Sequence, residues 1–117
     1  FDGRVGFSID NGRYDAWITS DRSIDDGRWH HLAMSWDASG VDLYIDGMLE
    51  AQDRDFRPVA QGRLSELRFG GGLGDVKFAA FSGCIDEIGL WDRGLISAEI
   101  KHQYKAALGT DERQLAQ

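Results

Sequence analysis

Two adjacent histidines, His30 and His31, are the side chains of this sequence that most resemble metal ligands. Adjacent residues on a β-strand point to opposite faces, so two neighbouring rings cannot readily hold one ion. The chain places no cysteine near them and contains no His-x-His spacing. We therefore interpret both as strand histidines that are satisfied by hydrogen bonds within the fold.

Carboxylates are the next candidates, because the chain has 20 acidic residues and paired carboxyl groups hydrolyse glycosidic bonds. Such a pair lies roughly 5 to 9.5 Å apart across the scissile bond. Asp86 and Glu87 are adjacent in an expected strand, which puts them on opposite faces, and that strand has no third acid. Cys84 has no basic neighbour in the sequence that would activate its thiol. The sequence therefore predicts that the chain is not an enzyme.

Aromatic side chains are better candidates, and they predict binding rather than catalysis. Trp17 is expected on the polar face of its strand beside Arg13 and Asp15, and Tyr44 opposite the apolar stripe of its own strand. Amphipathic rings with polar neighbours suit the stacking of a sugar ring and hydrogen bonding to its hydroxyls. The alternative is that both rings belong to a second buried layer. The tryptophans expected in the core are Trp29, Trp36 and Trp91.

Charge and composition exclude several partners. The 117 residues carry a formal net charge of −7, whereas nucleic-acid binders present a basic stripe and anionic membranes attract basic segments. No apolar run approaches the ~20 residues that span a bilayer. The single cysteine, Cys84, is expected to be a small buried apolar side chain or to bond with a cysteine outside these residues. Because the chain begins at Phe1 and not at Met, we expect a cut start, whose export signal would not be visible.

The elements that must position these residues are short alternating strands. Residues 4–10 and 13–20 flank Asp10-Asn11-Gly12 and predict one hairpin, and residues 29–36 and 41–46 predict a second. Further strands are expected at 48–54, 64–70 and 84–91, and the glycine-rich stretch 70–74 is expected to be a loop. Together they predict an all-β antiparallel sandwich.

Helical periodicity occurs once, near the end of the chain. Ser97 is expected to cap a short helix that carries Ile100 and Tyr104 on its apolar stripe and ends at Leu108, with Gly109 at the C′ position. The predicted organisation is one domain over residues 1–109 and a polar tail or linker over 110–117.

Two motifs carry a resemblance to a known family. The run DGRWHHLAMSWDASGVDLYIDG and the later run FSGCIDEIGLWDRGLISAEI resemble, in order, the Trp-His strand and the Ile-Asp-Glu strand of laminin G-like, concanavalin A-like jelly-roll domains, which include the pentraxins. The resemblance covers roughly residues 4–107. It implies a jelly-roll β-sandwich and a recognition or adhesion role.

The chain departs from that family in two respects. Family members carry further strands before the segment that matches Phe1, so the strand at 84–91 would have an open edge for self-association or strand complementation. The loop 70–78, which matches the calcium loop of pentraxins, has Asp75 as its only acid, too few oxygens for calcium. Asp86 matches an aspartate that holds a structural Ca²⁺ in bacterial members; the alternative is that it faces solvent or pairs with an arginine.

These observations predict a non-catalytic, lectin-like module of an extracellular, cell-surface or periplasmic protein. Its expected ligand is a carbohydrate or a protein, with carbohydrate leading. The second hypothesis is a structural accessory domain that packs against another domain or chain and binds no free ligand.

Overall fold

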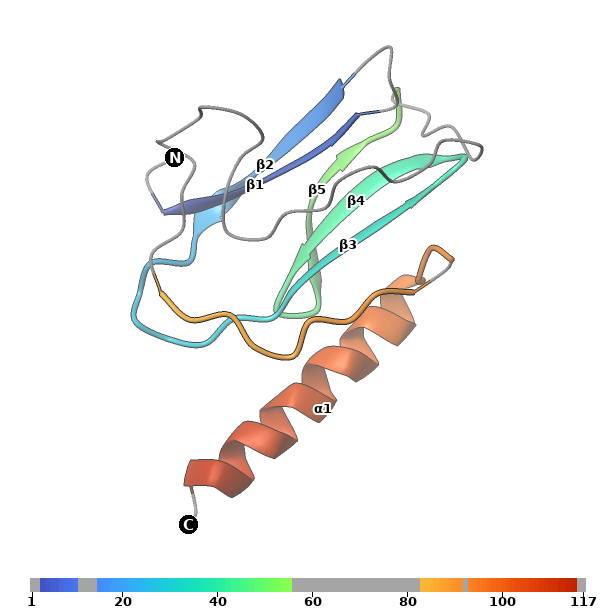
Figure 1. Ribbon diagram of the computed structural model, residues 1–117. Coiled ribbons are helices and arrows are strands. Elements are labelled where there is room, and N and C mark those ends of the chain that lie inside the picture. The colour runs from blue at the N-terminus through green and yellow to red at the C-terminus, as the bar shows by residue number, and fades with distance from the viewer. Residues whose placement is uncertain (1–2, 11–14, 56–82, 92, 116–117) are drawn as a thin grey trace.

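The computed structural model describes residues 3–10, 15–55, 83–91 and 93–115. Five strands and one helix make up the described elements (Figure 1). In chain order they are β1 (Arg4–Asp10), β2 (Asp15–Ser23), β3 (Leu32–Asp37), β4 (Gly40–Ile45), β5 (Met48–Asp53) and α1 (Ser97–Leu115). β1 and β2 form one antiparallel sheet, and β3, β4 and β5 form a second in that order. The predicted antiparallel sandwich with a C-terminal helix is confirmed.

The core lies between the inner faces of the two sheets. Val41 and Leu43 alternate along one face of β4 and pack with Ile18 of β2, and all three are buried. Partly buried apolar side chains from both sheets surround them: Val5, Phe7, Met34 and Ala51. The period-two pattern of each strand therefore decides which side chains face the other sheet.

The outer face of β4 is covered as well. The segment before α1 and the first turns of α1 lie against this face, and Ile100 of the helix is 1% exposed (Figure 1). Ser35 of β3 donates a hydrogen bond to the Leu95 carbonyl at 2.9 Å. Tyr44, predicted to lie on an exposed face, is therefore only 4% exposed. The residues after position 92 cover this face of β4, and the alternation of β4 alone could not predict this covering.

A two-residue turn, Asp46-Gly47, joins β4 to β5. Both residues have positive φ, 52° and 79°, as a type I′ hairpin requires. A Cβ at Gly47 would come within 3.1 Å of the Tyr104 ring, so only glycine lets the turn approach α1 this closely. The turn is thus a contact point between the second sheet and the helix.

The segment 83–91 differs from its prediction as a strand. It has no regular structure, its residues are exposed, and Glu87 has a φ of 54°, which interrupts an extended conformation. Cys84 is exposed rather than buried. Alternating composition favours a strand, but a strand forms only when a neighbour accepts its hydrogen bonds. The predicted strand at 64–70 lies outside the described residues.

The helix begins near its predicted position and ends later. Ile96 caps it: its carbonyl accepts the Ile100 N–H at 3.1 Å, and its own N–H donates to Glu99 at 3.1 Å. A hydrogen-bonded ion pair with Arg93 lowers the pKa of Glu99 to about 2. The Ser97 hydroxyl contacts Tyr44 instead of capping the helix.

Gly109 does not end the helix, because α1 runs on to Leu115. A glycine inside a helix costs only about 1 kcal/mol and does not force termination. Residues 110–115 therefore belong to the helix, and the predicted polar tail or linker over 110–117 stays a prediction about domain organisation. Within the described residues no helix is both long and apolar enough to cross a membrane.

The three tryptophans expected in the core are more exposed than predicted. Trp29 is 59% exposed in the connection before β3, and Trp91 is 50% exposed in the irregular segment. Trp36 is 37% exposed and stacks on Phe7 with ring centroids 6.1 Å apart, at the margin of the core. Small aliphatic side chains, not tryptophans, fill the centre.

Ile100→Ala is expected to destabilise the fold by about 2–4 kcal/mol, because it removes buried methyl groups and leaves a cavity under α1. Leu108, 41% exposed on the same helix, is the matched control, and Leu108→Ala is expected to cost about 0.5 kcal/mol or less. Urea unfolding followed by circular dichroism measures both. Equal effects of the two substitutions would show that α1 does not pack as described.

Candidate functional site

Trp17 is the predicted ligand-binding residue that the structure places on an exposed face. It lies on β2, it is 48% exposed, and its neighbour Ile18 faces the opposite side of the strand. Ile18 is in the core, so Trp17 points to the outer face of the β1–β2 sheet. The sequence predicted this orientation correctly.

Gly6 explains how the indole is held. Trp17 pairs with Ser8 across the hairpin, and Gly6 lies diagonally opposite on β1. A Cβ at Gly6 would approach Trp17 Cζ2 to 3.2 Å, so the absence of a side chain leaves room for the six-membered ring. Thr19 and Ser8, both half-buried, share this outer face. The result is one large aromatic ring among small polar side chains.

Among the other predicted binding residues, the structure describes the side chain of Tyr44 alone. Arg13 lies outside the described residues, and Asp15 is on β2, two positions from Trp17, with its side chain not described. Tyr44 is buried on the other sheet, and its hydroxyl lies 2.9 Å from Ser97 Oγ. Tyr44 therefore cannot offer an exposed ring face for stacking, which corrects the prediction made for it.

Asp86, the predicted calcium ligand, lies in the irregular segment. It is exposed, and its carboxylate accepts the N–H of Glu87 at 2.8 Å. Calcium takes six to eight oxygens, and the part of the chain that the structure describes contains no group of three or more acidic, histidine or cysteine side chains that could hold a metal. The described residues do not fit the ion, and Asp86 as a calcium ligand stays a prediction from the motif.

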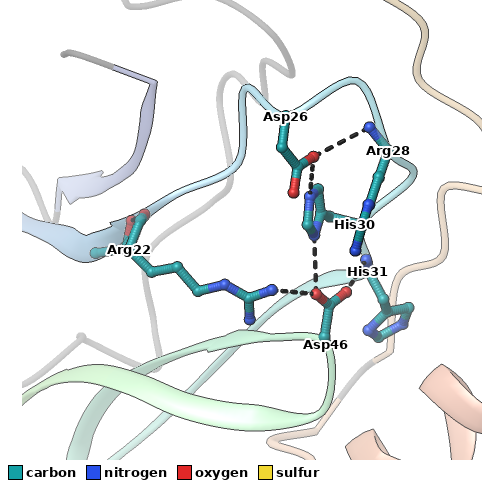
Figure 2. A network of polar contacts seen from close by, with 7 residues as sticks. Arg22, Asp26, Arg28, His30, His31 and Asp46 are labelled. Atoms are coloured by element: carbon teal, nitrogen blue, oxygen red, sulfur yellow. Dashed lines mark hydrogen bonds and ion pairs between the residues drawn. The ribbon is translucent and has the colours of Figure 1, made fainter.

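A network of polar contacts centres on Asp46, in the β4–β5 turn (Figure 2). Its Oδ2 lies 2.9 Å from Arg22 Nη2, at the end of β2, and 2.8 Å from His30 Nδ1. Its Oδ1 accepts the backbone N–H of His31 at 2.9 Å. On the far side of the ring, His30 Nε2 lies 2.8 Å from Asp26 Oδ1. One imidazole therefore bridges two carboxylates.

This geometry favours the protonated form of His30. Burial acts to lower its pKa, but hydrogen bonds to Asp46 and Asp26 outweigh burial and raise the pKa above 6.5. The same contacts lower the pKa of both aspartates: the bond to His30 does so at Asp26, and at Asp46 the bonds to His30 and His31 overcome desolvation. With both ring nitrogens donating to carboxylates, His30 has no lone pair for a metal or for a substrate proton.

The network also corrects the account of the two histidines. Hydrogen bonds satisfy the His30 ring, as predicted, but both residues lie before β3 and not within a strand. The His31 ring packs near Tyr104 of α1, at 6.1 Å between centroids, and burial lowers its pKa against the opposing charge of Asp46. The Asp-Gly turn signal was visible in the sequence, but the long-range partners of Asp46 were not.

Two facing antiparallel sheets with a core between them define a β-sandwich. A family model described as the concanavalin A-like lectin/glucanases superfamily matches residues 2–101. The chain belongs to this superfamily, as the two sequence motifs predicted.

Two further similarities agree with this assignment. The chain is 30% identical over 92 residues to the rat (Rattus norvegicus) sushi, von Willebrand factor type A, EGF and pentraxin domain-containing protein 1. The matched region makes up 72% of this chain and 3% of the rat protein. The fold is also similar to a crystal structure of an S-layer domain-containing protein (residues 221–444) from Clostridium thermocellum. That match has a TM-score of 0.58 and 23% identity, over 87% of this chain and 52% of the other.

Stability is expected to depend on pH through the Asp46 network. The raised pKa of His30 stabilises the folded state. This stabilisation is fully present below pH 6.5 and is lost as the pH rises through the pKa of His30 in the folded state. The lowered pKa values of Asp26 and Asp46 also stabilise the folded state. This stabilisation is present above pH 3.8 and is lost as the pH falls through the pKa of each aspartate in the folded state. The loss in Tm caused by His30→Gln should therefore be largest between pH 3.8 and 6.5 and shrink above it.

Differential scanning fluorimetry across this pH range measures the effect. His102→Gln, on an exposed helix position, is the matched control, and its Tm difference should stay small at every pH. A His30→Gln penalty that grows as pH rises above 6.5 would contradict the charged bridge.

Proposed function

We propose that this chain is a non-catalytic recognition module of an exported or surface protein and that its ligand is carbohydrate. One observation carries the proposal: Trp17 presents a half-exposed indole on the outer face of the β1–β2 sheet, held against Gly6. An aromatic ring that the fold already holds in place stacks on a sugar without losing much side-chain entropy. The C–H face of a pyranose matches such a ring.

The surroundings of Trp17 favour a neutral, hydroxyl-bearing ligand. Ser8 and Thr19 offer hydroxyls that both donate and accept hydrogen bonds. These groups match sugar hydroxyls, whereas the net charge of −7 disfavours anionic ligands. Membership of a superfamily described as lectins and glucanases supports a carbohydrate ligand.

Two arguments favour binding without catalysis and a location outside the cell. Asp86 and Glu87 are adjacent in the sequence, and the segment 83–91 contains no other acid. A glycosidase needs two carboxyl groups on either side of the scissile bond, and this segment offers no second acid spaced to complete such a pair. The rat relative combines pentraxin and EGF domains in its name, which supports an exported or surface protein. The chain spans 3% of that relative, so the whole protein's activity rests on regions that this sequence does not include.

Trp17→Ala is expected to abolish glycan binding, because it removes the stacking surface, while Trp17→Phe retains part of it. Trp29→Ala is the matched control, since Trp29 is similarly exposed but lies in the connection between β2 and β3 and not on a strand of the β1–β2 sheet. A glycan array identifies a ligand, and isothermal titration calorimetry compares the variants. The absence of any glycan binding by the wild-type chain, or equal losses in both alanine variants, would reject the proposal.

A second candidate function rests on a different surface. Four large apolar side chains of the segment 83–91 are 49 to 65% exposed, namely Ile85, Ile88, Leu90 and Trp91. Such a patch is typical of an interface. We propose as the alternative that the chain is a structural accessory domain that packs through this segment against a second chain, without a free ligand.

Self-association is the expected outcome of that alternative. The mass from light scattering should exceed that of a monomer, and it should rise with salt, which screens the repulsion between copies of charge −7. Ile88→Asp should restore the monomer, whereas Met48→Asp, 63% exposed on β5, should not. A wild-type monomer at high salt and high concentration would exclude this form of packing.

A further inference from the structure

A recess lies on the outer face of the β3–β5 sheet, away from Trp17. It has a volume of about 290 Å³ and is open to solvent between the sheet and the segment that precedes α1. Six polar side chains contribute to its lining, namely Ser35, Asp37, Asp42, Tyr44, Arg54 and Ser97. None of them belongs to the Asp46 network or to the β1–β2 face.

Strand pairing explains why these groups converge. Ser35 is paired with Asp42 and Asp37 with Gly40, so their outward positions lie side by side on β3 and β4. Gly40 contributes no side chain, and a Cβ there would clash with the Asp53 carbonyl at 2.3 Å. Only glycine therefore lets β4 approach the backbone at Asp53 this closely at the edge of the recess, and a substitution would also strain the backbone, at a φ of 134°.

The floor and one wall are held by hydrogen bonds within the fold. The Ser35 hydroxyl donates to the Leu95 carbonyl at 2.9 Å, and the Tyr44 hydroxyl lies 2.9 Å from Ser97 Oγ. Ser35 and Tyr44 are both less than 8% exposed, so the floor of the recess is made of buried side chains. A ligand would meet a surface already in place, which lowers the entropic cost of binding.

The charges in the recess are mixed and nearly balanced. Arg54 Nη2 lies 2.8 Å from Asp42 Oδ1, and their side chains are 47% and 19% exposed. Asp37 accepts the N–H of Ser39 at 2.7 Å. One guanidinium and two carboxylates leave a small negative charge, which disfavours phosphate or sulfate groups. Donors and acceptors in close alternation fit hydroxyl groups, each of which both donates and accepts.

We propose that this recess is a second carbohydrate subsite that takes one neutral sugar ring, with Asp42 and Arg54 bonding to its hydroxyls. Ligand pockets in proteins occupy roughly 300–1,000 Å³, so a recess at the lower limit takes a single ring rather than a chain. Leu49 and Ile96, 48% and 65% exposed, line the same recess and offer apolar contact to the C–H face of the ring. The proposal rests on the carbohydrate-binding function proposed above and adds a second, separate site to it.

The test is an ¹H–¹⁵N titration of the full chain with glucose, galactose, mannose and N-acetylglucosamine, each added separately. One of these sugars is expected to shift the amide signals of Gly40, Asp42 and Ser97 in a saturable manner. Arg54→Gln is expected to weaken this binding about tenfold, the effect of losing one charge-assisted hydrogen bond. Arg28→Gln, at an exposed arginine outside the recess, is the matched control and should leave the affinity unchanged.

Trp17→Ala separates the two sites. Saturable shifts at the recess that survive Trp17→Ala and weaken in Arg54→Gln support the subsite. Glycan binding that requires Trp17 without any sugar-induced shift at Gly40, Asp42 and Ser97 rejects the subsite and leaves the proposed function standing. The absence of all glycan binding rejects both. Circular dichroism of Arg54→Gln excludes loss of folding as the cause, and Asp42→Asn supplies a second variant of the same ion pair.

Discussion

The described structure depends most on the contacts of the Asp46 carboxylate. It joins three parts of the chain that are distant in sequence: the end of β2 through Arg22, the approach to β3 through His30 and His31, and the β4–β5 turn that carries it. The side chain is 16% exposed, so its partners must replace most of its water. Leaving a buried polar group unpaired costs about 1–3 kcal/mol, and leaving a charged group unpaired costs more. The left-handed backbone at Asp46 aims the carboxylate at these partners, and the neighbouring Gly47 lets α1 pack on the turn.

This arrangement leaves two separate surfaces for function. The inner faces of the sheets form the core, so Trp17 and the recess around Asp42 lie on opposite outer faces of the sandwich. The Trp17 face presents an exposed indole on the β1–β2 hairpin. The recess instead depends on the chain after residue 92, which folds back onto β3 and β4. A ligand that contacts both surfaces would have to pass around the molecule, so each surface has to be understood as a site of its own.

The segment 83–91 shows the limit of reading strands from composition. Its alternating apolar residues favour β-structure, and the motif that contains it resembles a strand of the family. Backbone N–H and C=O groups need partners, however, and a segment forms a strand only where a neighbouring strand supplies them. Glu87 adopts a positive φ there, and large apolar side chains remain exposed. The same residues in contact with a neighbouring strand would have both their hydrogen bonds and their apolar surface satisfied.

The sequence by itself determined the hairpins, the inner stripe of Leu43 and Ile45, the exposed position of Trp17 and the family. Each follows from local alternation, from turn residues such as Asp46-Gly47, or from motifs that lie in one stretch of chain. Only the tertiary structure decided that Tyr44 is buried, that His30 bridges two carboxylates and that polar groups converge in a recess. Those outcomes depend on contacts between residues such as Ser35 and Leu95, or Asp46 and His30, that are far apart in the chain. Local alternation states which face a side chain occupies, but not what covers that face, because the cover is supplied by segments whose positions depend on the whole fold.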